Sequence, residues 1–433
     1  MQVTKDKAPG EPYFTFEFPA TVDLARFEAY RSFVKAISTS IPYTITFPKD
    51  WPSTSGQAPL RPLLPNLQSI TINTFGWVPD RYVDWVPRLL TPDLKEFKMY
   101  SLLLEDNSGA DPENAWLNPS KCIELIDAIS RTCSAIKTLE IFAQESEAKE
   151  DKIEYNVLCE KVAGLHSLRS LSFSGANAGE TLFRAFGRLP HLEYLSLVSD
   201  TSQMLPGKGS PVILSDDSFP ALQHLALRRL YPNIITRVYD SPQLFGRLVS
   251  AEIVYDNDDD SDGDESCDLR SAYAMRCLSH GCSNLANLSI LTEGGVGFFC
   301  VFRRFIPIFK QMPLRCLRLC SVDLNPELSY LAEKEDLEEN DPKVTWEEFF
   351  TGLPHLEELV LNNLFNTKDL MVLADLLPKL CYFSPRGIQA PRTEHAFSVT
   401  TRSTTTQPII ICCNFYLYKY ADEPAKRISQ VAR

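Results

Sequence analysis

This 433-residue chain has no run of about 20 apolar residues, so its sequence predicts no transmembrane helix. The longest apolar stretches are Val296–Lys310, which Arg303 and Arg304 interrupt, and Ile409–Leu417, which is too short. The opening residues MQVTKDKAPGEPYF contain no apolar segment of the kind that an export signal needs. We therefore expect a cytoplasmic or nuclear protein whose 12 cysteines are reduced thiols.

Basic residues are scarce. Lys and Arg number 43 against 56 Asp and Glu, which gives a formal net charge of −13. A balance of this sign repels phosphate, so we expect neither nucleic acid nor an anionic membrane as a partner. The hydrophobic content of 44% is that of a folded protein with a sizeable core.

Catalytic signatures are also missing. The chain has six histidines and no G-x-S-x-G, H-E-x-x-H or Walker motif. His191 and His355 occupy the same slot of a repeated motif, which favours a structural role. Cys316 and Cys320 have a tolerable spacing for zinc, but no further pair completes a tetrahedral set. We therefore expect no enzyme activity, no metal site and no cofactor.

The feature that is present is a repeat of the form leucine-x-x-leucine-x-leucine. Clear copies include LPNLQSITI, LHSLRSLSF, LPHLEYLSL, FPALQHLAL and LPHLEELVL. The fourth residue of each quoted stretch is position 1 of the motif, which we call the anchor. Eleven anchors follow one another: Leu67, Leu94, Ile136, Leu168, Leu192, Leu222, Leu248, Leu285, Leu314, Leu356 and Leu380. Adjacent anchors lie 24 to 42 residues apart. The shorter spacings are typical of leucine-rich repeats, and the longer ones indicate insertions.

Each repeat predicts one strand followed by one helix. Positions 4 and 6 of the motif lie two apart and point inward from a strand together with position 1. Helical patterns follow at Lys121–Ser130, Glu180–Leu189 and Asp369–Leu377. Alternating strands and helices favour parallel strands with right-handed crossovers, and stacked units bury one another's apolar faces. We predict an α/β leucine-rich-repeat solenoid, a right-handed horseshoe with parallel strands on the concave face and helices on the convex face.

Three regions follow along the chain. Residues 1–63 form an N-terminal helical cap and loop, with a helix expected at Val22–Ile37; residues 64–384 carry the irregular repeats, with acidic insertions near 144–154, 256–268 and 333–341; residues 385–433 form a flexible Ser/Thr-rich tail with a short apolar segment. Within that tail, Ile409–Tyr420 is expected to add one edge strand.

Positions 3, 5 and 7 of each motif should face solvent on the concave side, because positions 4 and 6 face inward. Aromatic and Arg side chains carry much of the binding energy at protein interfaces. They are also ordinary strand residues. The candidate protein-binding residues are Tyr100, Phe142, Tyr194, His224, Arg228 and Arg318. We expect replacement of Tyr100, Phe142 and Tyr194 by Ala to abolish partner capture without unfolding the chain.

The irregular repeats, the motifs LPHLEYLSL and LPHLEELVL and the acidic insertions resemble the repeat region of fungal F-box/leucine-rich-repeat-like proteins. The segment RFEAYRSFVKAI is similar to the stretch that follows the F-box in that group. The resemblance covers Arg26–Phe383. It implies that the repeats hold a substrate of a ubiquitin ligase. The F-box that docks a Skp-type adaptor is not visible, so that adaptor is expected only if an equivalent module exists.

We therefore predict an intracellular protein-binding scaffold, a substrate-recognition protein related to F-box ubiquitin-ligase receptors, which binds through its concave strand face. Two alternatives remain open. One is a regulatory repeat protein of the ribonuclease-inhibitor-like or GTPase-activator-like kind. The other is a parallel β-helix carbohydrate-active enzyme, against which the helical intervals argue.

Overall fold

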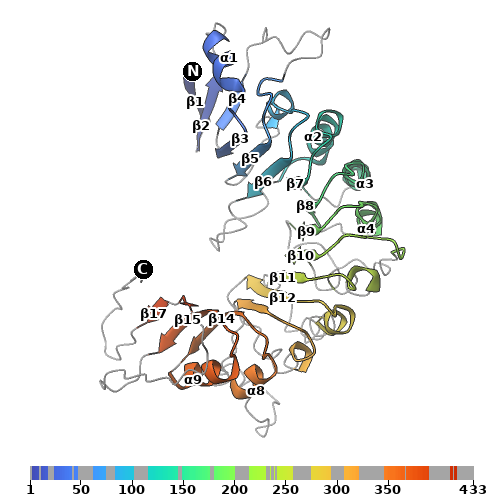
Figure 1. Ribbon diagram of the computed structural model, residues 1–433. Coiled ribbons are helices and arrows are strands. Elements are labelled where there is room, and N and C mark those ends of the chain that lie inside the picture. The colour runs from blue at the N-terminus through green and yellow to red at the C-terminus, as the bar shows by residue number, and fades with distance from the viewer. Residues whose placement is uncertain are drawn as a thin grey trace. The chain divides into compact units, whose positions relative to one another are not determined.

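The computed structural model (Figure 1) describes a series of segments that includes all the repeat strands. They are residues 2–8, 11–17, 24–40, 43–46, 62–74, 83–101, 116–144, 149–175, 180–199, 214–230, 235, 238, 241–256, 275–293, 307–320, 346–365, 367–389, 410–412 and 414–416. The chain divides into two compact units. The N-terminal unit is Met1–Gln223 with Leu227–Leu230, and the C-terminal unit is His224–Ala226 with Tyr231–Arg433.

The N-terminal unit is built on parallel strands in chain order. They are β3 (Ala36–Ser40), β5 (Ser69–Thr74), β6 (Glu96–Ser101), β7 (Thr138–Ile141), β8 (Ser170–Ser174) and β9 (Tyr194–Val198). Strand β10 (His224–Arg228) falls where the two units divide. A smaller sheet combines β1 (Gln2–Ala8), β2 (Glu11–Glu17) and β4 (Tyr43–Thr46). The sequence analysis did not predict these three strands.

Helices of the N-terminal unit lie along one side of its repeat strands (Figure 1). They are α2 (Pro119–Thr132), α3 (Lys149–Ala163) and α4 (Glu180–Gly187), with the short η2 (Val86–Arg88) in an earlier repeat. Asn118 caps α2, because its side-chain oxygen accepts a hydrogen bond from the Ser120 amide at 2.9 Å, and Pro119 suits the first helical turn. Helix α1 (Leu24–Arg31) precedes β3.

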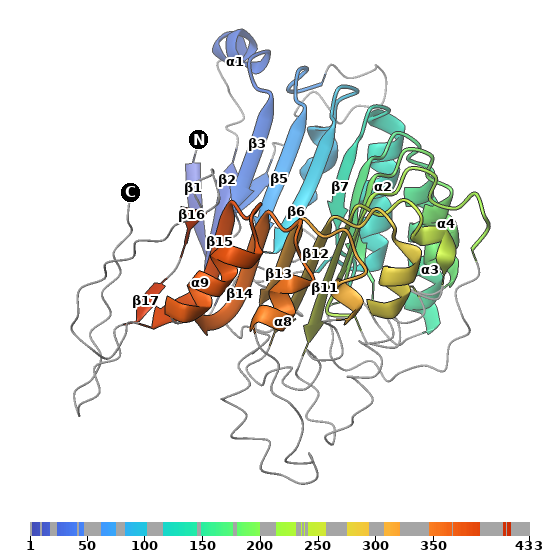
Figure 2. The ribbon, with the colours of Figure 1, turned by 60° about the horizontal axis from the view of Figure 1, so that its bottom comes forward.

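The C-terminal unit repeats the same construction. Its parallel strands are β11 (Ser250–Asp256), β12 (Asn287–Glu293), β13 (Cys316–Cys320), β14 (Glu358–Phe365) and β15 (Tyr382–Gln389), with β16 (Ile410–Ile411) and β17 (Asn414–Tyr416) both paired to β15. Helices α8 (Trp346–Thr351) and α9 (Thr367–Leu376) lie on one side of β13–β15 (Figure 2), and the short η5 (Pro242–Leu244) precedes β11.

Each unit is organised around a spine of buried anchor residues, most of them leucines. All eleven anchors are at most 2% exposed, and each repeat strand from β5 to β15 begins two residues after its anchor. Position 4 is equally buried, as at Leu195, Leu225, Leu288 and Leu359. Phenylalanines thicken the core on the helix side, with the Phe173 and Phe186 rings 5.2 Å apart. The chain is an α/β solenoid of leucine-rich repeats. Its helices, up to 15 residues long, separate it from a parallel β-helix.

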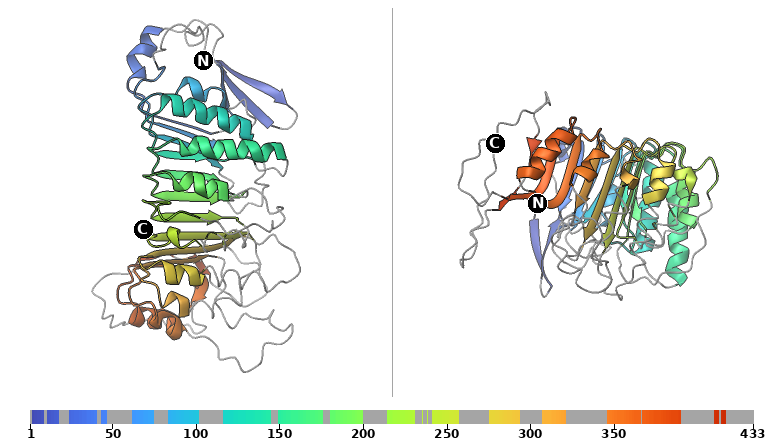
Figure 3. Two further views of the ribbon diagram at one scale, coloured as in Figure 1. Left: turned by 90° about the vertical axis from the view of Figure 1, so that its right-hand side faces the viewer. Right: turned by 90° about the horizontal axis from the view of Figure 1, so that it is seen from below.

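Several predicted elements are confirmed. Helices α2, α4 and α9 match the three helical patterns, and β16 and β17 supply the expected edge strand. Strand order is easiest to follow in Figure 3, where the repeat strands of each unit follow one another edge to edge. Within the described segments, no helix is both long and apolar enough to cross a bilayer.

Three expectations need correction or lie outside the described residues. Helix α1 ends at Arg31, and Ala36–Ser40 forms a twelfth repeat strand, β3, so the expected helix Val22–Ile37 is too long. The described part of the 144–154 insertion includes the first turns of α3, because Tyr155, Leu158 and Val162 bury that helix against the spine. The insertion near 333–341, and residues 257–268 of the one before it, lie outside the described residues.

Candidate protein-binding face

The outward face of the repeat strands is formed by positions 3 and 5 of each motif. We call it the strand face. In the N-terminal unit the strand register places position 5 of successive repeats side by side, in the order Thr71, Lys98, Glu140, Ser172 and Ser196. Position 3 forms a second row, in the order Ser69, Glu96, Thr138, Ser170 and Tyr194. These rows bring together residues more than 120 positions apart in the chain.

A charged cluster occupies the first half of this face. Lys98 Nζ lies 3.5 Å from Glu96 Oε2, and Ser69 Oγ donates a hydrogen bond to the same carboxylate oxygen at 3.4 Å. Glu140 lies opposite Lys98 in the register. Burial raises the pKa of Glu140, and the nearby charge of Glu96 adds to that rise, while Lys98 and Arg228 oppose it. Glu140 is thus a carboxylate held partly out of water beside Lys98.

Serines form the second half of the face. Ser172 is 8% exposed and Ser196 is 2% exposed, and the two are register partners. Ser170 is half-buried and lies opposite Tyr194. We call Ser170, Ser172 and Ser196 the serine floor. The side chains of the serine floor are small. Its register neighbours Glu140, beside Ser172, and Tyr194, beside Ser170, have larger side chains and border it.

Position 7 belongs to the interior in three successive repeats. Phe142 is 7% exposed, Ser174 is fully buried and Val198 is 2% exposed. Phe142 and Val198 form an apolar cluster with Trp116, whose ring lies 5.4 Å from that of Phe142. The expectation that Phe142 faces solvent is therefore wrong.

The segment just before α2 explains this burial. Leu117 pairs with Ala143 in a parallel bridge, which carries Trp116 over the end of β7. Ser174 is tied down from two directions: the Ala143 amide donates to its Oγ at 3.2 Å, and the Tyr155 hydroxyl donates to its carbonyl oxygen. Trp116 thus packs on the seventh positions Phe142 and Val198, while Ala143 and Tyr155 hold Ser174, at positions that the motif alone would leave open.

The remaining predicted residues have different surroundings. Tyr194, His224 and Arg228 are half-buried, and only the backbone of Tyr100, in β6, is described. Arg318, in the C-terminal unit, is exposed and ion-paired with Glu358, with Nη2 and Oε1 2.7 Å apart. Of the six, Tyr194 borders the serine floor, and Arg228 acts electrostatically on Glu140. The sequence analysis did not select Glu96, Lys98 and Glu140 of the charged cluster. Their place at positions 3 and 5 was the available signal.

The C-terminal unit presents a different strand face. Its position 5 row contains Glu252, Ser289, Arg318 and Val360, of which Arg318 is exposed and the others half-buried. Burial raises the pKa of Cys316, with a further rise from Glu358 and an opposing effect of Arg318. Among the described residues, no group of three or more His, Cys, Asp or Glu side chains is placed to hold a metal ion.

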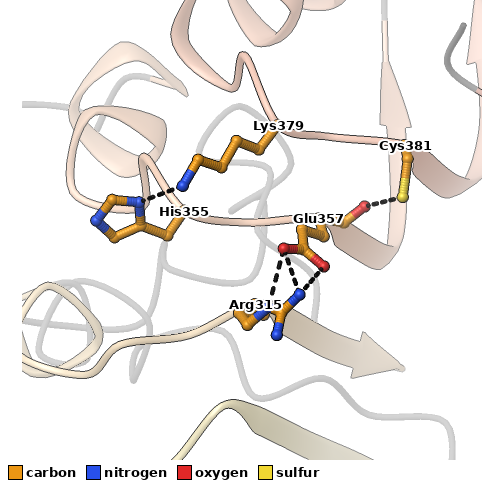
Figure 4. A network of polar contacts seen from close by, with 5 residues as sticks. All are labelled: Arg315, His355, Glu357, Lys379 and Cys381. Atoms are coloured by element: carbon orange, nitrogen blue, oxygen red, sulfur yellow. Dashed lines mark hydrogen bonds and ion pairs between the residues drawn. The ribbon is translucent and has the colours of Figure 1, made fainter. Parts of the chain in front are cut away.

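At the start of the strands, the C-terminal unit carries a polar network (Figure 4). Arg315 makes a bidentate contact with Glu357, through hydrogen bonds of 2.9 and 2.8 Å. Lys379 Nζ lies 3.2 Å from His355 Nδ1, and Cys381 Sγ donates to the Glu357 carbonyl oxygen at 3.2 Å. Each of these residues occupies position 2 or the position before an anchor, so the network links consecutive repeats.

Comparison with known proteins gives likenesses among solved structures alone. No protein-family model matches the chain, and no curated protein matches it. A solved structure described as "Crystal structure of mouse RP105/MD-1 complex" aligns with a TM-score of 0.31 and 14% sequence identity, over 81% of this chain and 58% of the solved one. This chain thus spans less than two thirds of that protein's length. The fold assignment rests on the repeats and the strand register.

Proposed function

We propose that this protein is a binding scaffold without catalytic activity, and that it holds a protein partner on the strand face of its N-terminal unit. The observation that carries the proposal is the serine floor, bordered by Glu140 and Tyr194 and continuous with the Glu96–Lys98 pair. This arrangement presents small, charged and aromatic side chains on one run of hydrogen-bonded strands.

The chemistry of that face suits protein recognition. Small side chains on the floor allow a partner's backbone or a bulky side chain to approach the sheet closely. Tyr194 offers a rigid aromatic surface with a polar end, which is enriched where binding energy concentrates. The charges of Lys98 and Glu140 give the face an orientation, because a partner must match their signs.

The finer proposal is that the partner is a substrate delivered to a ubiquitin ligase. Its support is the resemblance of Arg26–Phe383 to F-box/leucine-rich-repeat proteins, in which the repeats hold the substrate. A regulatory repeat protein of the ribonuclease-inhibitor-like or GTPase-activator-like kind would use the same face without a Skp-type adaptor.

A matched pair of double variants tests the face. The face variant carries Lys98→Ala and Tyr194→Ala, both half-buried on the strand face. The control carries Ile153→Ala, within α3, and Arg188→Ala, directly after α4. Both side chains are exposed. After affinity capture and mass spectrometry identify a partner, its Kd is measured for each purified variant.

We expect the face variant to bind at least about tenfold more weakly, since one interface anchor can contribute about 2 kcal/mol. The control should bind within about twofold of the unchanged chain. Equal affinity for face variant and unchanged chain would remove the strand face as the site. A Skp-type adaptor among the captured proteins tests the ligase proposal separately, and its absence would leave the binding face standing.

A further inference from the structure

A row of six residues, four of them basic, crosses the start of the strands in the N-terminal unit. It consists of the residue directly before β3 and the position 2 residues of the next five repeats: Lys35, Gln68, Lys95, Lys137, Arg169 and Glu193. From Gln68 onward, the backbone amide of each member donates a hydrogen bond to the carbonyl oxygen of the preceding member of the row, at 2.7 to 2.8 Å. The six residues are therefore consecutive rungs of one ladder, although they span Lys35 to Glu193 in sequence. We call them the strand-start row.

Side chains of this row point to solvent. Each follows an inward residue, and Lys35, Lys95, Lys137 and Arg169 are all exposed. Lys95 Nζ donates to the Gln68 amide oxygen at 3.3 Å, and Arg169 pairs with Glu193 at 2.6 Å. Among the described residues, no carboxylate lies within ion-pair distance of Lys35, Lys95 or Lys137.

The row places like charges on neighbouring strands, in a chain whose net charge is negative. Neighbouring parallel strands lie about 4.8 Å apart, so Lys95, Lys137 and Arg169 place three cations on adjacent rungs. Like charges directly across a strand pair are destabilising. The chain as a whole carries −13, so acidic side chains to neutralise the row are abundant in its composition. Of the three cations, Arg169 has a carboxylate on the next rung, Glu193, as Arg315 has Glu357 in the C-terminal unit. Lys95 and Lys137 have no such carboxylate among the described residues.

We infer that the strand-start row of the N-terminal unit is a docking site for an acidic peptide segment of a partner protein. It is a second surface, separate from the strand face, and does not depend on the function proposed for that face. An acidic peptide supplies discrete carboxylates to discrete ammonium groups, and bringing them together relieves the repulsion along the row.

The shape of the row favours a peptide over a nucleic acid. It covers about five strand spacings, or roughly 24 Å. Its last member is the acidic Glu193, and the next rung of the ladder is the uncharged Gln223. The exposed carboxylate of Asp93 lies two residues before Lys95 in the same strand-start turn. A continuous phosphate backbone would meet these acidic groups and the net negative field of the chain, whereas a short acidic segment can fit between them.

Binding of a fluorescein-labelled decamer of glutamate to the full chain, followed by anisotropy, tests the inference. The row variant carries Lys95→Glu and Lys137→Glu. The control carries Lys310→Glu and Lys379→Glu, two exposed lysines of the C-terminal unit, so the change in net charge is identical. A milder variant, Lys95→Gln with Lys137→Gln, guards against misfolding, and circular dichroism checks every variant.

The expected result is binding at low ionic strength that weakens as salt is added, because the pairs are exposed. The row variant should bind about tenfold more weakly or worse, the glutamine variant should fall between, and the control should stay within about twofold. The Lys98→Ala and Tyr194→Ala face variant should bind the decamer unchanged, which separates the two surfaces.

Four outcomes would overturn the inference. They are no binding of the decamer by the unchanged chain; equal losses in the row variant and the control, which would report net charge alone; loss in the face variant, which would place the peptide on the strand face; and tighter binding of a single-stranded DNA decamer than of the glutamate decamer.

Discussion

The N-terminal and C-terminal units have interiors of the same construction, but they differ in the residues at position 5 and at the start of the strands. In both, position 1 and position 4 residues are buried within the same narrow range. On the strand face, however, position 5 reads Lys98, Glu140, Ser172, Ser196 in one unit and Glu252, Ser289, Arg318, Val360 in the other. At the start of the strands, both units contain an Arg paired with a Glu on the next rung, Arg169 with Glu193 and Arg315 with Glu357, but the first unit adds the exposed Lys95 and Lys137.

This difference shows which positions of a repeat are free to vary. An inward leucine must fill the space between two neighbouring repeats, so it is constrained at each coil. Outward positions do not fill the space between repeats, so their side chains can vary in charge and size from repeat to repeat. A surface that is unbalanced in charge or unusually small in side chains is therefore the part of a repeat protein that carries information about a partner.

The largest expected effect concerns position 7. Phe142 packs in the N-terminal unit against Trp116 and Val198, whereas Leu291, at position 7 of β12 in the C-terminal unit, is half-buried. We expect Phe142→Ala to lower the free energy of unfolding by about 3–5 kcal/mol and Leu291→Ala by about 1 kcal/mol. Urea titration followed by circular dichroism measures both. Equal losses would show that position 7 is alike in the two units.

The spine should respond alike in both units. Leu195 and Leu359 are fully buried at position 4 of their motifs. Each replacement by Ala removes the same atoms from an equally close-packed interior, so both should lower the free energy of unfolding by about 3 kcal/mol. The same urea titration compares them. A much smaller loss at Leu359 would break the equivalence of the two interiors.

Two glycines provide a smaller contrast. A Cβ on Gly175, after β8, would lie 2.9 Å from Leu197 Cβ and 3.3 Å from the Val198 amide nitrogen, while one on Gly246 would meet nothing within 4 Å. We expect Gly175→Ala to lower stability by about 1–3 kcal/mol. Gly246→Ala should stay within about 0.5 kcal/mol of the unchanged chain. Thermal unfolding of the two variants side by side decides, and a neutral Gly175→Ala would contradict the close packing after β8.

The smallest effect is a dependence on pH at Glu140. Burial raises the pKa of this carboxyl in the folded chain above its unfolded value of about 4.3. A group shifted in this direction contributes stability below the unfolded value and loses it as the pH rises through the folded-state pKa. The stability of the unchanged chain relative to Glu140→Gln should therefore fall as the pH rises from about 4.3 through that higher pKa.

Urea unfolding in steps of pH measures this trend. Glu252→Gln, at position 5 of β11 in the C-terminal unit, is the matched control for removal of one half-buried carboxyl. A relative stability that rises with pH in the Glu140 pair would mean that Lys98 and Arg228 outweigh the burial of this side chain.

Much of the fold could be predicted from the local pattern of apolar residues in the sequence. A strand begins two residues after every anchor from Leu67 to Leu380, because the period of two and the need to bury leucine are local properties. The strand β3 was not predicted, because its motif has Val34 and Ile37 at positions 1 and 4, where leucine is usual. The burial of Phe142 could not be predicted, since it depends on Trp116, which lies 26 residues away in the segment between two repeats.

For the candidate surfaces too, local spacing determined one part and the tertiary structure determined the other. The sequence alone established the leucine spine, the alternation of strand and helix, and the orientation of positions 3 and 5, because each follows from spacing within one repeat. Only the tertiary structure decided which outward residues are neighbours. Lys35, Lys95, Lys137 and Arg169 form a row because hydrogen bonds between strands align residues from separate repeats, and no local spacing encodes that register.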